Sequence, residues 1–371
     1  MTRSNKLFFL LLRLGLNTAD DHDLREAATL PQTEIDWEAL YRMALKQGVS
    51  AIAYDGLKRL LDEGALPAEK GPSRTLRIQW AGNVLQAEEH YAKQKELIER
   101  LALLYATQGI DLMILKGYGL SLTYPVPEHR TCADIDIWLF GRQREADRLV
   151  QQRYSVEINE EYNYHTTFYL ERILVENHFH FLNIQTHHSN RKIEAQLQAM
   201  VQKLPEETAQ VGEATVYLPP ANFDAIFLLR HAAAHFAAIG IGVRYLIDWA
   251  MFVRRYHRQI DWTTLERIAE EENMHRFLHC MNAFATDCLG IDPALFPTFP
   301  RDHALEERVL QDILHPRFPK RPPKGNMLQV LWFKLRRWWT YRWKHGIVYR
   351  ESQLRLFLTQ GWSLLRGPKP M

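Results

Sequence analysis

The sequence predicts an α+β fold in which a small mixed β-sheet is embedded in a mainly helical protein. Apolar runs of strand length are concentrated between residues 110 and 181, whereas the segments on either side carry apolar residues at helical spacing. A block of short strands between helical blocks is typical of α+β proteins. With 371 residues, the chain is long enough for two domains or one elaborated domain.

The composition is that of an ordinary globular protein, with 46% hydrophobic and 24% charged residues. A formal net charge of +2 gives no support to nucleic-acid binding by the whole chain. Three cysteines without zinc-like spacing, Cys132, Cys280 and Cys288, favour a reducing cytoplasm over a disulfide framework. No apolar run approaches the roughly 20 residues that a membrane span needs. We therefore expect a cytoplasmic protein.

Residues 1–105 are expected to form a helical segment that packs on the core. The apolar start at 6–16 resembles a short signal sequence, but Arg13 interrupts it and no small-residue cleavage site follows, which favours an amphipathic first helix. Residues 35–61 have apolar positions at helical spacing. Residues 80–105 are rich in Ala, Glu, Gln and Lys, which are good helix formers.

Residues 106–215 are expected to contain the sheet, because their pattern changes to short apolar and β-branched runs separated by turn residues. The predicted elements, in order, are a strand at 110–115, a short helix at 119–122, a strand at 131–140, a charged helix at 142–153 and a hairpin of 166–170 with 173–181.

Residues 216–315 are expected to form a helical bundle, because apolar stripes recur at helical spacing. Asp261 or Thr263 is expected to cap one of these helices, since both residue types accept hydrogen bonds from the first turn. The predicted helices are 223–239, 244–257, 262–271 and 274–289.

Residues 316–371 form a basic, tryptophan-rich tail that is expected to be helical. Five tryptophans are interleaved with many cations, and Glu351 is the single acidic residue. This mixture fits an interfacial helix on an anionic membrane, which would make the protein a peripheral membrane protein. It also fits a segment that docks on the protein itself, with arginine stems covering tryptophan rings. Nucleic-acid binding through stacked aromatics is less favoured.

Two carboxylates separated by one residue, Asp134 and Asp136, are the most informative local feature. The surrounding run alternates with period 2, so both side chains are expected on one face of one strand. Two adjacent negative charges repel unless a positive group lies between them. A hard divalent cation such as Mg²⁺ is a common solution, and the pair therefore predicts half of a metal site.

Three further features lie in order around this pair. Lys116-Gly117 follows the first predicted strand, where a glycine lets backbone N–H groups approach a phosphate. Arg130 lies in the loop before the aspartates and can meet a phosphate or carboxylate with a fork of donors. Glu176 lies among apolar neighbours in the hairpin, where a carboxylate is costly to bury unless it is paired or binds a metal. Ordinary alternatives remain for each: a solvated lysine, a structural ion pair and an edge-strand surface residue.

This order of motifs resembles the nucleotidyltransferase superfamily of the DNA polymerase β type. In that superfamily, a glycine-containing strand–turn–helix precedes an Asp-x-Asp strand and a third carboxylate on a later strand. More narrowly, the chain is similar to an uncharacterised bacterial family, nucleotidyltransferase family 5. One departure is Tyr118, which follows Gly117 where the superfamily often has serine or glycine. The segments that carry the resemblance are Leu115-Lys116-Gly117, Tyr124, Arg130, Asp134-Ile135-Asp136-Ile137, Val175-Glu176-Asn177-His178, His231 with His235, and Arg244 with Asp248.

The resemblance implies transfer of a nucleoside monophosphate from a nucleoside triphosphate to a hydroxyl of an unknown acceptor, which is a small molecule, a sugar-type compound or a protein. It implies dependence on Mg²⁺, or on Mn²⁺ in its place. Glu176 would complete a two-metal site or act as a general base. The implied catalytic and metal-binding residues are Asp134, Asp136 and Glu176, and the implied nucleotide-binding residues are Lys116, Gly117 and Arg130.

Two other functions stay open. A degenerate site would leave a binding or scaffold protein that keeps the fold and uses the basic tail to reach a membrane or partner. An antitoxin-like nucleotidyltransferase would modify a partner protein.

Five polar residues outside the carboxylate motifs are candidates for an acceptor cleft: His178, His231, His235, Arg244 and Asp248. The paired histidines and the Arg–Asp pair both have i,i+4 spacing, so each pair lies on one helix face. The favoured interpretation of the two pairs is a polar network that joins the helical half to the sheet, and that of His178 is a partly buried sheet residue.

Overall fold

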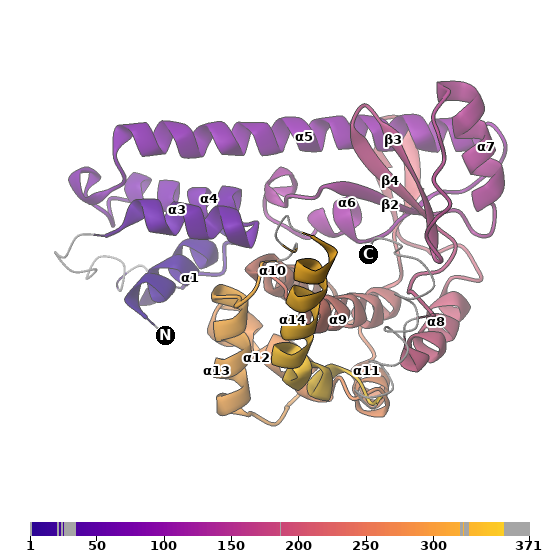
Figure 1. Cartoon of the computed structure of the whole chain (residues 1–371). Helices are drawn as coiled ribbons and strands as arrows, with labels where there is room; N and C mark the ends of the chain where they lie inside the picture. The colour runs from indigo at the N-terminus through magenta and orange to yellow at the C-terminus, as the bar shows by residue number, and fades with distance from the viewer. Residues whose placement is uncertain are drawn as a thin grey trace.

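A computed structural model describes residues 2–20, 22–23, 25, 35–185, 187–319, 322 and 326–351. Within these residues, helices surround one six-stranded mixed sheet, which confirms the expected α+β class (Figure 1). No helix in the described ranges has both the length and the apolar character needed to cross a membrane.

The N-terminal helices are α1 (Arg3–Gly15), α3 (Trp37–Gln47) and α4 (Ser50–Asp62). Helix α1 forms as predicted but is not amphipathic in its packing, because residues 7–12 are all buried. Its close approach to α4 depends on Gly56, where a Cβ would lie only 1.9 Å from the carbonyl oxygen of Leu11. Arg13, the charge that interrupts the apolar run, forms an ion pair with Asp23.

Helix α5 (Arg74–Ala106) connects this N-terminal group to the sheet (Figure 1). Its 33 residues correspond to about 50 Å of helix. Ser73 caps it by accepting from the backbone N–H of Leu76. Near its C-terminal end, Leu97, Ile98 and Leu101 belong to the same buried cluster as the sheet residues Ile135 and Val175.

The sheet has the strand order β3-β4-β2-β1-β6-β5. Strand β2 pairs antiparallel with β1 and parallel with β4, while β3–β4 and β5–β6 are antiparallel hairpins. The predicted strands and the first hairpin are confirmed, although β1 is only two residues long; the second hairpin was not predicted. The strands are β1 (Met113–Ile114), β2 (Asp134–Trp138), β3 (His165–Leu170), β4 (Ile173–His178), β5 (Thr208–Val211) and β6 (Ala214–Tyr217).

The two faces of the central strands differ in chemistry. Ile135, Ile137 and Val175 are buried in the cluster that includes α5 and α7 (Gln143–Tyr154). Since side chains alternate along a strand, Asp134 and Asp136 project from the opposite face. In the parallel pairing of β2 with β4, Asp136 lies directly opposite Glu176. The apolar face therefore packs the strands against the helices, and the carboxylates on the polar face are available for a functional site.

The helical half confirms the four predicted helices within a few residues. Asp261 is the N-cap of α11, accepting from the backbone N–H of Thr264 at 3.0 Å. Helices α8 and α13 were not predicted. The helices are α8 (His188–Met200), α9 (Ala221–Ala238), α10 (Val243–Tyr256), α11 (Trp262–Glu271), α12 (His275–Asp287) and α13 (His303–Leu314).

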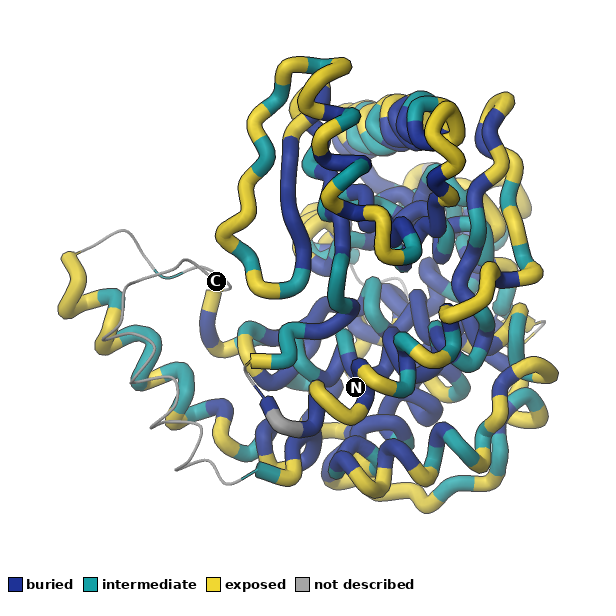
Figure 2. The backbone as a smooth tube through the Cα atoms, turned by 90° about the vertical axis from the view of Figure 1, so that its right-hand side faces the viewer, coloured by how far each residue is buried: buried dark blue, intermediate teal, exposed yellow. Residues whose placement is uncertain are grey.

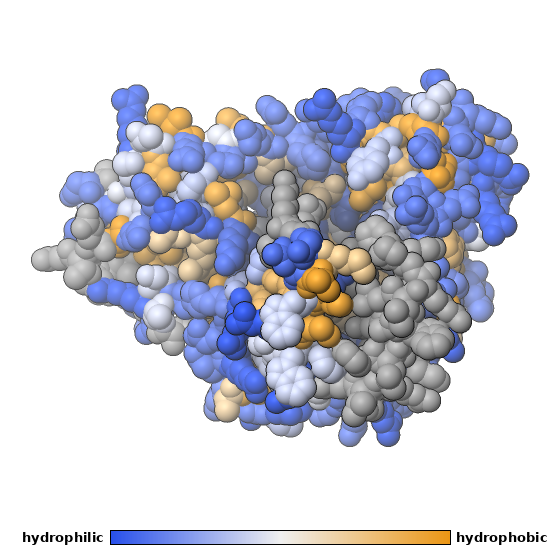
Figure 3. Space-filling view, viewed as in Figure 1, coloured by the Kyte–Doolittle hydropathy of each residue, from blue (hydrophilic) through white to orange (hydrophobic). Residues whose placement is uncertain are grey.

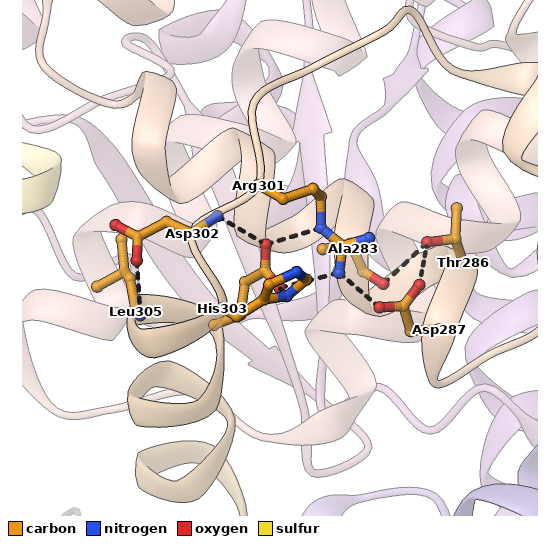
Figure 4. A network of polar contacts seen from close by, with 8 residues as sticks. Ala283, Thr286, Asp287, Arg301, Asp302, His303 and Leu305 are labelled. Atoms are coloured by element: carbon orange, nitrogen blue, oxygen red, sulfur yellow. Dashed lines mark hydrogen bonds and ion pairs between the residues drawn. The ribbon is translucent and has the colours of Figure 1, made fainter.

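Arg301 links α12 to α13 (Figure 4). Its guanidinium contacts Glu306 at 2.8 Å and Asp287 at 2.5 Å. Glu306 in turn accepts from the backbone N–H of Asp302, the N-cap of α13. The network fixes the start of α13 against the end of α12.

The predicted tail contains α14 (Met327–Val348), whose two halves have different surroundings (Figure 2). The first half is largely exposed, whereas Tyr341, Ile347 and Val348 near its end are buried. The fully buried Arg230 donates to the carbonyl of Val348, and Lys344 forms an ion pair with Asp312. The end of the helix is thus part of the protein body. Residues 320–321, 323–325 and 352–371 of the tail, which include Trp362, lie outside the described residues.

His129 joins the loop before β2 to two helices. Its Nδ1 lies 2.5 Å from Asp55 Oδ2 of α4, and its Nε2 lies 2.9 Å from Glu88 Oε1 of α5. Burial opposes protonation, but the hydrogen bonds to these carboxylates outweigh it and raise the pKa of His129 above its ordinary value of 6.5.

Replacing His129 by glutamine is expected to destabilise the protein more at pH 6 than at pH 9. The folded-state pKa lies above the unfolded value, so the stabilisation is fully present below about pH 6.5 and is lost as the pH rises through the folded-state pKa. Urea unfolding of both proteins at the two pH values measures this difference. An equal loss at both values would contradict it.

Candidate functional site

The turn between β1 and α6 (Lys116–Ser121) places Lys116 beside the aspartate strand. Gly117 has φ +36° and ψ −113°, a conformation that other residues rarely adopt. Lys116 Nζ lies 3.0 Å from Asp136 Oδ1. Burial opposes the charge of Lys116, but Asp136, Glu176 and Asp134 together raise its pKa, so it remains a cation.

Replacing Gly117 by alanine is expected to lower the free energy of unfolding by about 1–2 kcal/mol, because a Cβ at positive φ is strained. The matched control is Gly82→Ala in α5, where a Cβ would meet nothing within 4 Å and where alanine favours the helix. Thermal or urea unfolding measures both. Equal effects of the two substitutions would show that the turn does not require glycine.

Asp136 is the buried centre of the site, with 1% of its surface exposed. Its Oδ1 lies 3.0 Å from both Lys116 Nζ and His178 Nε2, while its Oδ2 is buried without a hydrogen-bond partner. Burial opposes ionisation, but the nearby Lys116 and His178 lower the pKa of Asp136 well below its ordinary value of 3.8. The residue therefore remains a carboxylate.

Asp134 and Glu176 share the polar face with Asp136. Asp134 is half-buried, and its pKa is raised above 3.8 by burial and by the charge of Asp136, while Lys116 acts in the opposite direction. The side chain of Glu176 is 19% exposed and lies opposite Asp136 in the strand register. The three predicted carboxylates thus lie on one face of two adjacent strands, with one buried and two accessible.

Two histidines complete this face, and one of them was not predicted. His178 of β4 is 3.5 Å from Glu176 Oε2; burial lowers its pKa, but hydrogen bonds to Asp136 and Glu176 outweigh this and raise it to about 9. His165 of β3 lies opposite His178, and burial lowers its pKa to about 4. Period 2 within the predicted hairpin places His165 on this face, but that prediction began at residue 166.

Helices α9 and α10 bring three of the predicted cleft residues toward the polar face. Burial and the charge of Lys116 lower the pKa of His231, and the ring of His231 lies 4.5 Å from that of His235. Arg244 donates to the carbonyl of Thr131 at 2.6 Å, and its charge is among those that lower the pKa of Asp134. Arg244 is therefore a cation close to the carboxylates.

Arg130 and Asp248 form a separate buried ion pair. Arg130 Nε and Nη2 donate to the two carboxylate oxygens of Asp248 at 2.8 and 3.0 Å, and the hydroxyl of Tyr124 donates to Asp248 at 2.5 Å. The pair joins α10 to the loop before β2, as expected of a polar network between the helical half and the sheet. It places Arg130 against Asp248, with Nη1 left without a hydrogen bond.

Tyr118, the departure from the superfamily pattern, lies away from the carboxylates. Its ring stacks on Tyr91 of α5 with centroids 5.3 Å apart, and it belongs to the apolar cluster on the other side of the sheet. The bulky side chain therefore does not fill the polar face.

Comparison with protein-family models agrees with the motifs. The model of a family described as uncharacterised nucleotidyltransferase matches residues 33–290. A search of the curated proteins gave no match. Among solved structures, an antigenic nucleotidyltransferase-like protein from Paracoccidioides brasiliensis is similar at 15% sequence identity and a TM-score of 0.35; the match covers 54% of this chain and 95% of that one.

Proposed function

Because the chain belongs to the family of uncharacterised nucleotidyltransferases, we propose that it transfers a nucleoside monophosphate from a nucleoside triphosphate to a hydroxyl acceptor. The observation that carries the proposal is the common face of Asp134, Asp136 and Glu176, with Lys116 at 3.0 Å from the central carboxylate. The acceptor is a small molecule, a sugar-type compound or a protein.

The donor set fits Mg²⁺, or Mn²⁺ in its place. Carboxylate oxygens are the ligands that Mg²⁺ prefers, and Asp136 Oδ2 is buried without a partner. Asp134, Asp136 and Glu176 would hold the ion, which when bound supplies positive charge to the phosphates. Asp136 is ionised in the folded protein, so it needs no prior deprotonation to act as a ligand.

In the proposed reaction, the acceptor oxygen attacks the α-phosphorus and the bond to pyrophosphate breaks. Glu176 is partly exposed and accepts the hydroxyl proton if it does not act as a ligand. Lys116 and Arg244 balance charge on the phosphates, because such transfers depend mainly on positioning and charge stabilisation. Arg130 would support the reaction indirectly, by positioning the loop before β2, because its guanidinium is paired with Asp248.

The direct test is incubation of the full chain with each α-labelled nucleoside triphosphate and Mg²⁺, alone and with cell extract. Label transferred to a small molecule or to a protein supports the proposal and identifies the acceptor class. Label on a small co-purifying partner protein would favour the antitoxin-like alternative. If no incubation transfers label and calorimetry shows no nucleotide binding, the proposal is contradicted and the scaffold function is the alternative that stays open.

A second proposed role is peripheral contact of α14 with an anionic membrane. Four large apolar side chains are strongly exposed between residues 327 and 339 of this helix: Met327, Leu328, Trp332 and Trp339. Figure 3 shows apolar and aromatic surface along this helix beside strongly hydrophilic surface. Residues 327–348 contain no acidic residue, and Arg336 is exposed among the tryptophans. Exposed tryptophan with cations and no acids is typical of an interfacial helix.

Replacing Trp332 and Trp339 by serine is expected to reduce flotation with phosphatidylserine-containing vesicles several-fold. The matched control replaces Ile78 and Leu85, two exposed apolar residues of α5, by serine. Point variants are preferable to truncation, because the end of α14 is buried in the protein body. The full chain should float less with neutral vesicles and at high salt. No lipid-dependent shift, or equal loss in both variants, would contradict the membrane role.

A further inference from the structure

His165, Glu176 and His178 form a compact ligand set beside the aspartates. Their ligand atoms all lie within 4.8 Å of one another. Glu176 Oε2 lies 3.7 Å from His165 Nδ1 and 3.5 Å from His178 Nε2. Strand pairing places the three together, because His165 lies opposite His178 across the β3–β4 hairpin and Glu176 lies two residues before His178.

These separations match the dimensions of a metal site. With metal–ligand distances of about 2.0–2.1 Å, the ligands of a tetrahedral ion lie roughly 3.4 Å apart. The two measured contacts to Glu176 exceed this value by only a few tenths of an ångström. Asp136 Oδ1, 3.0 Å from His178 Nε2, is close enough to provide a fourth ligand.

The histidine rings are also oriented as metal ligands usually are. The Nδ1 of His178 lies 3.1 Å from the carbonyl oxygen of His180, and this hydrogen bond directs Nε2 toward Glu176. His165 is 2% exposed, and its Nδ1 faces Glu176 without a hydrogen-bond partner. A buried imidazole nitrogen with no partner is costly unless something binds it.

We propose that His165, Glu176 and His178 bind a divalent first-row transition ion, with Zn²⁺ favoured over Mg²⁺. Imidazole nitrogen suits Zn²⁺ and similar ions, whereas Mg²⁺ demands oxygen ligands. The donor set of zinc sites is matched by two histidines and one carboxylate, with a fourth ligand available to complete the coordination. Glu176 is shared with the proposed Mg²⁺ site. The inference requires neither nucleotide nor turnover, so its failure would leave the transfer proposal standing.

The test measures metal binding by the untagged full chain without nucleotide. Equilibrium dialysis with Zn²⁺ in excess Mg²⁺, followed by elemental analysis, is expected to give one Zn²⁺ per chain. Co²⁺ in place of Zn²⁺ is expected to give a visible absorption spectrum of low-coordinate nitrogen and oxygen ligation. His165→Gln is expected to weaken Zn²⁺ binding at least ~10–100-fold.

His303→Gln is the matched control, since the side chain of His303 is 81% exposed and belongs to the network at the start of α13. It should bind Zn²⁺ as the unmodified chain does. Absence of Zn²⁺ and of a Co²⁺ spectrum in the unmodified chain would overturn the proposal even if His165→Gln failed to fold. Unchanged Zn²⁺ affinity in a folded His165→Gln variant would overturn it as well.

Discussion

Asp136→Asn is expected to reduce nucleotidyl transfer by about 10³-fold or more. Asparagine keeps the shape of the side chain but removes the charge that Lys116 and His178 surround. The measurement is label transfer from the nucleoside triphosphate at saturating Mg²⁺. Activity within about tenfold of the unmodified protein would contradict the assignment of Asp136 to the catalytic centre.

Stability must be measured alongside activity, because Asp136→Asn leaves Lys116 and His178 without their buried partner. Asp134→Asn is the companion variant. The pKa of Asp134 is raised by burial and by the charge of Asp136, so the folded state disfavours its ionised form. Its replacement should therefore lower transfer without lowering the free energy of unfolding. Asp111→Asn, at an exposed position before β1, is the surface control.

Asp248→Ala is expected to lower the free energy of unfolding by about 3–5 kcal/mol. It leaves the Arg130 guanidinium buried without its bidentate partner and also removes the acceptor of Tyr124. Urea unfolding measures the loss. A loss below about 1 kcal/mol would show that the pair contributes little to the fold.

A double-mutant cycle can distinguish a structural role of Arg130 from a role in nucleotide binding. In a double-mutant cycle, Arg130→Met combined with Asp248→Leu should recover much of the stability lost by either change alone, because no unpaired charge is then buried. If Arg130 acts only through the fold, the double variant should keep its KM for nucleotide. A large rise in KM in the folded double variant would instead support the predicted contact with the nucleotide.

The sequence was sufficient for the elements whose patterns are local. The alternation around Asp134 and Asp136 predicted β2, and helical spacing predicted α9 to α12 within a few residues. The hairpin β5–β6 was missed because its eight strand residues carry few of the long apolar side chains that mark a strand.

Local sequence patterns do not predict which distant side chains contact one another. Arg130 and Asp248 are 118 positions apart, and the spacing of either gives no sign of their pairing. The face that Tyr118 occupies depends on the turn at Gly117, and the surroundings of His165 depend on the register of β3 with β4. Period 2 placed Asp134 and Asp136 on one face, and the resemblance to the nucleotidyltransferase superfamily implied that Lys116 and Glu176 would join them, so the carboxylate face could be anticipated.

Helix α5 contributes to both large apolar clusters of the protein. Leu76 and Trp80 belong to the cluster of the N-terminal and C-terminal helices, while Leu97 and Leu101 belong to the cluster beneath the sheet. A continuous helix that donates side chains to two cores couples their melting, since neither core can lose its half of the helix without strain on the other. Strands β1 and β2 also contribute to both clusters, through Met113 and Ile114 and through Trp138 and Ile137. The folding unit is therefore larger than the sheet that carries the carboxylates, and α5 extends it to the N-terminal helices.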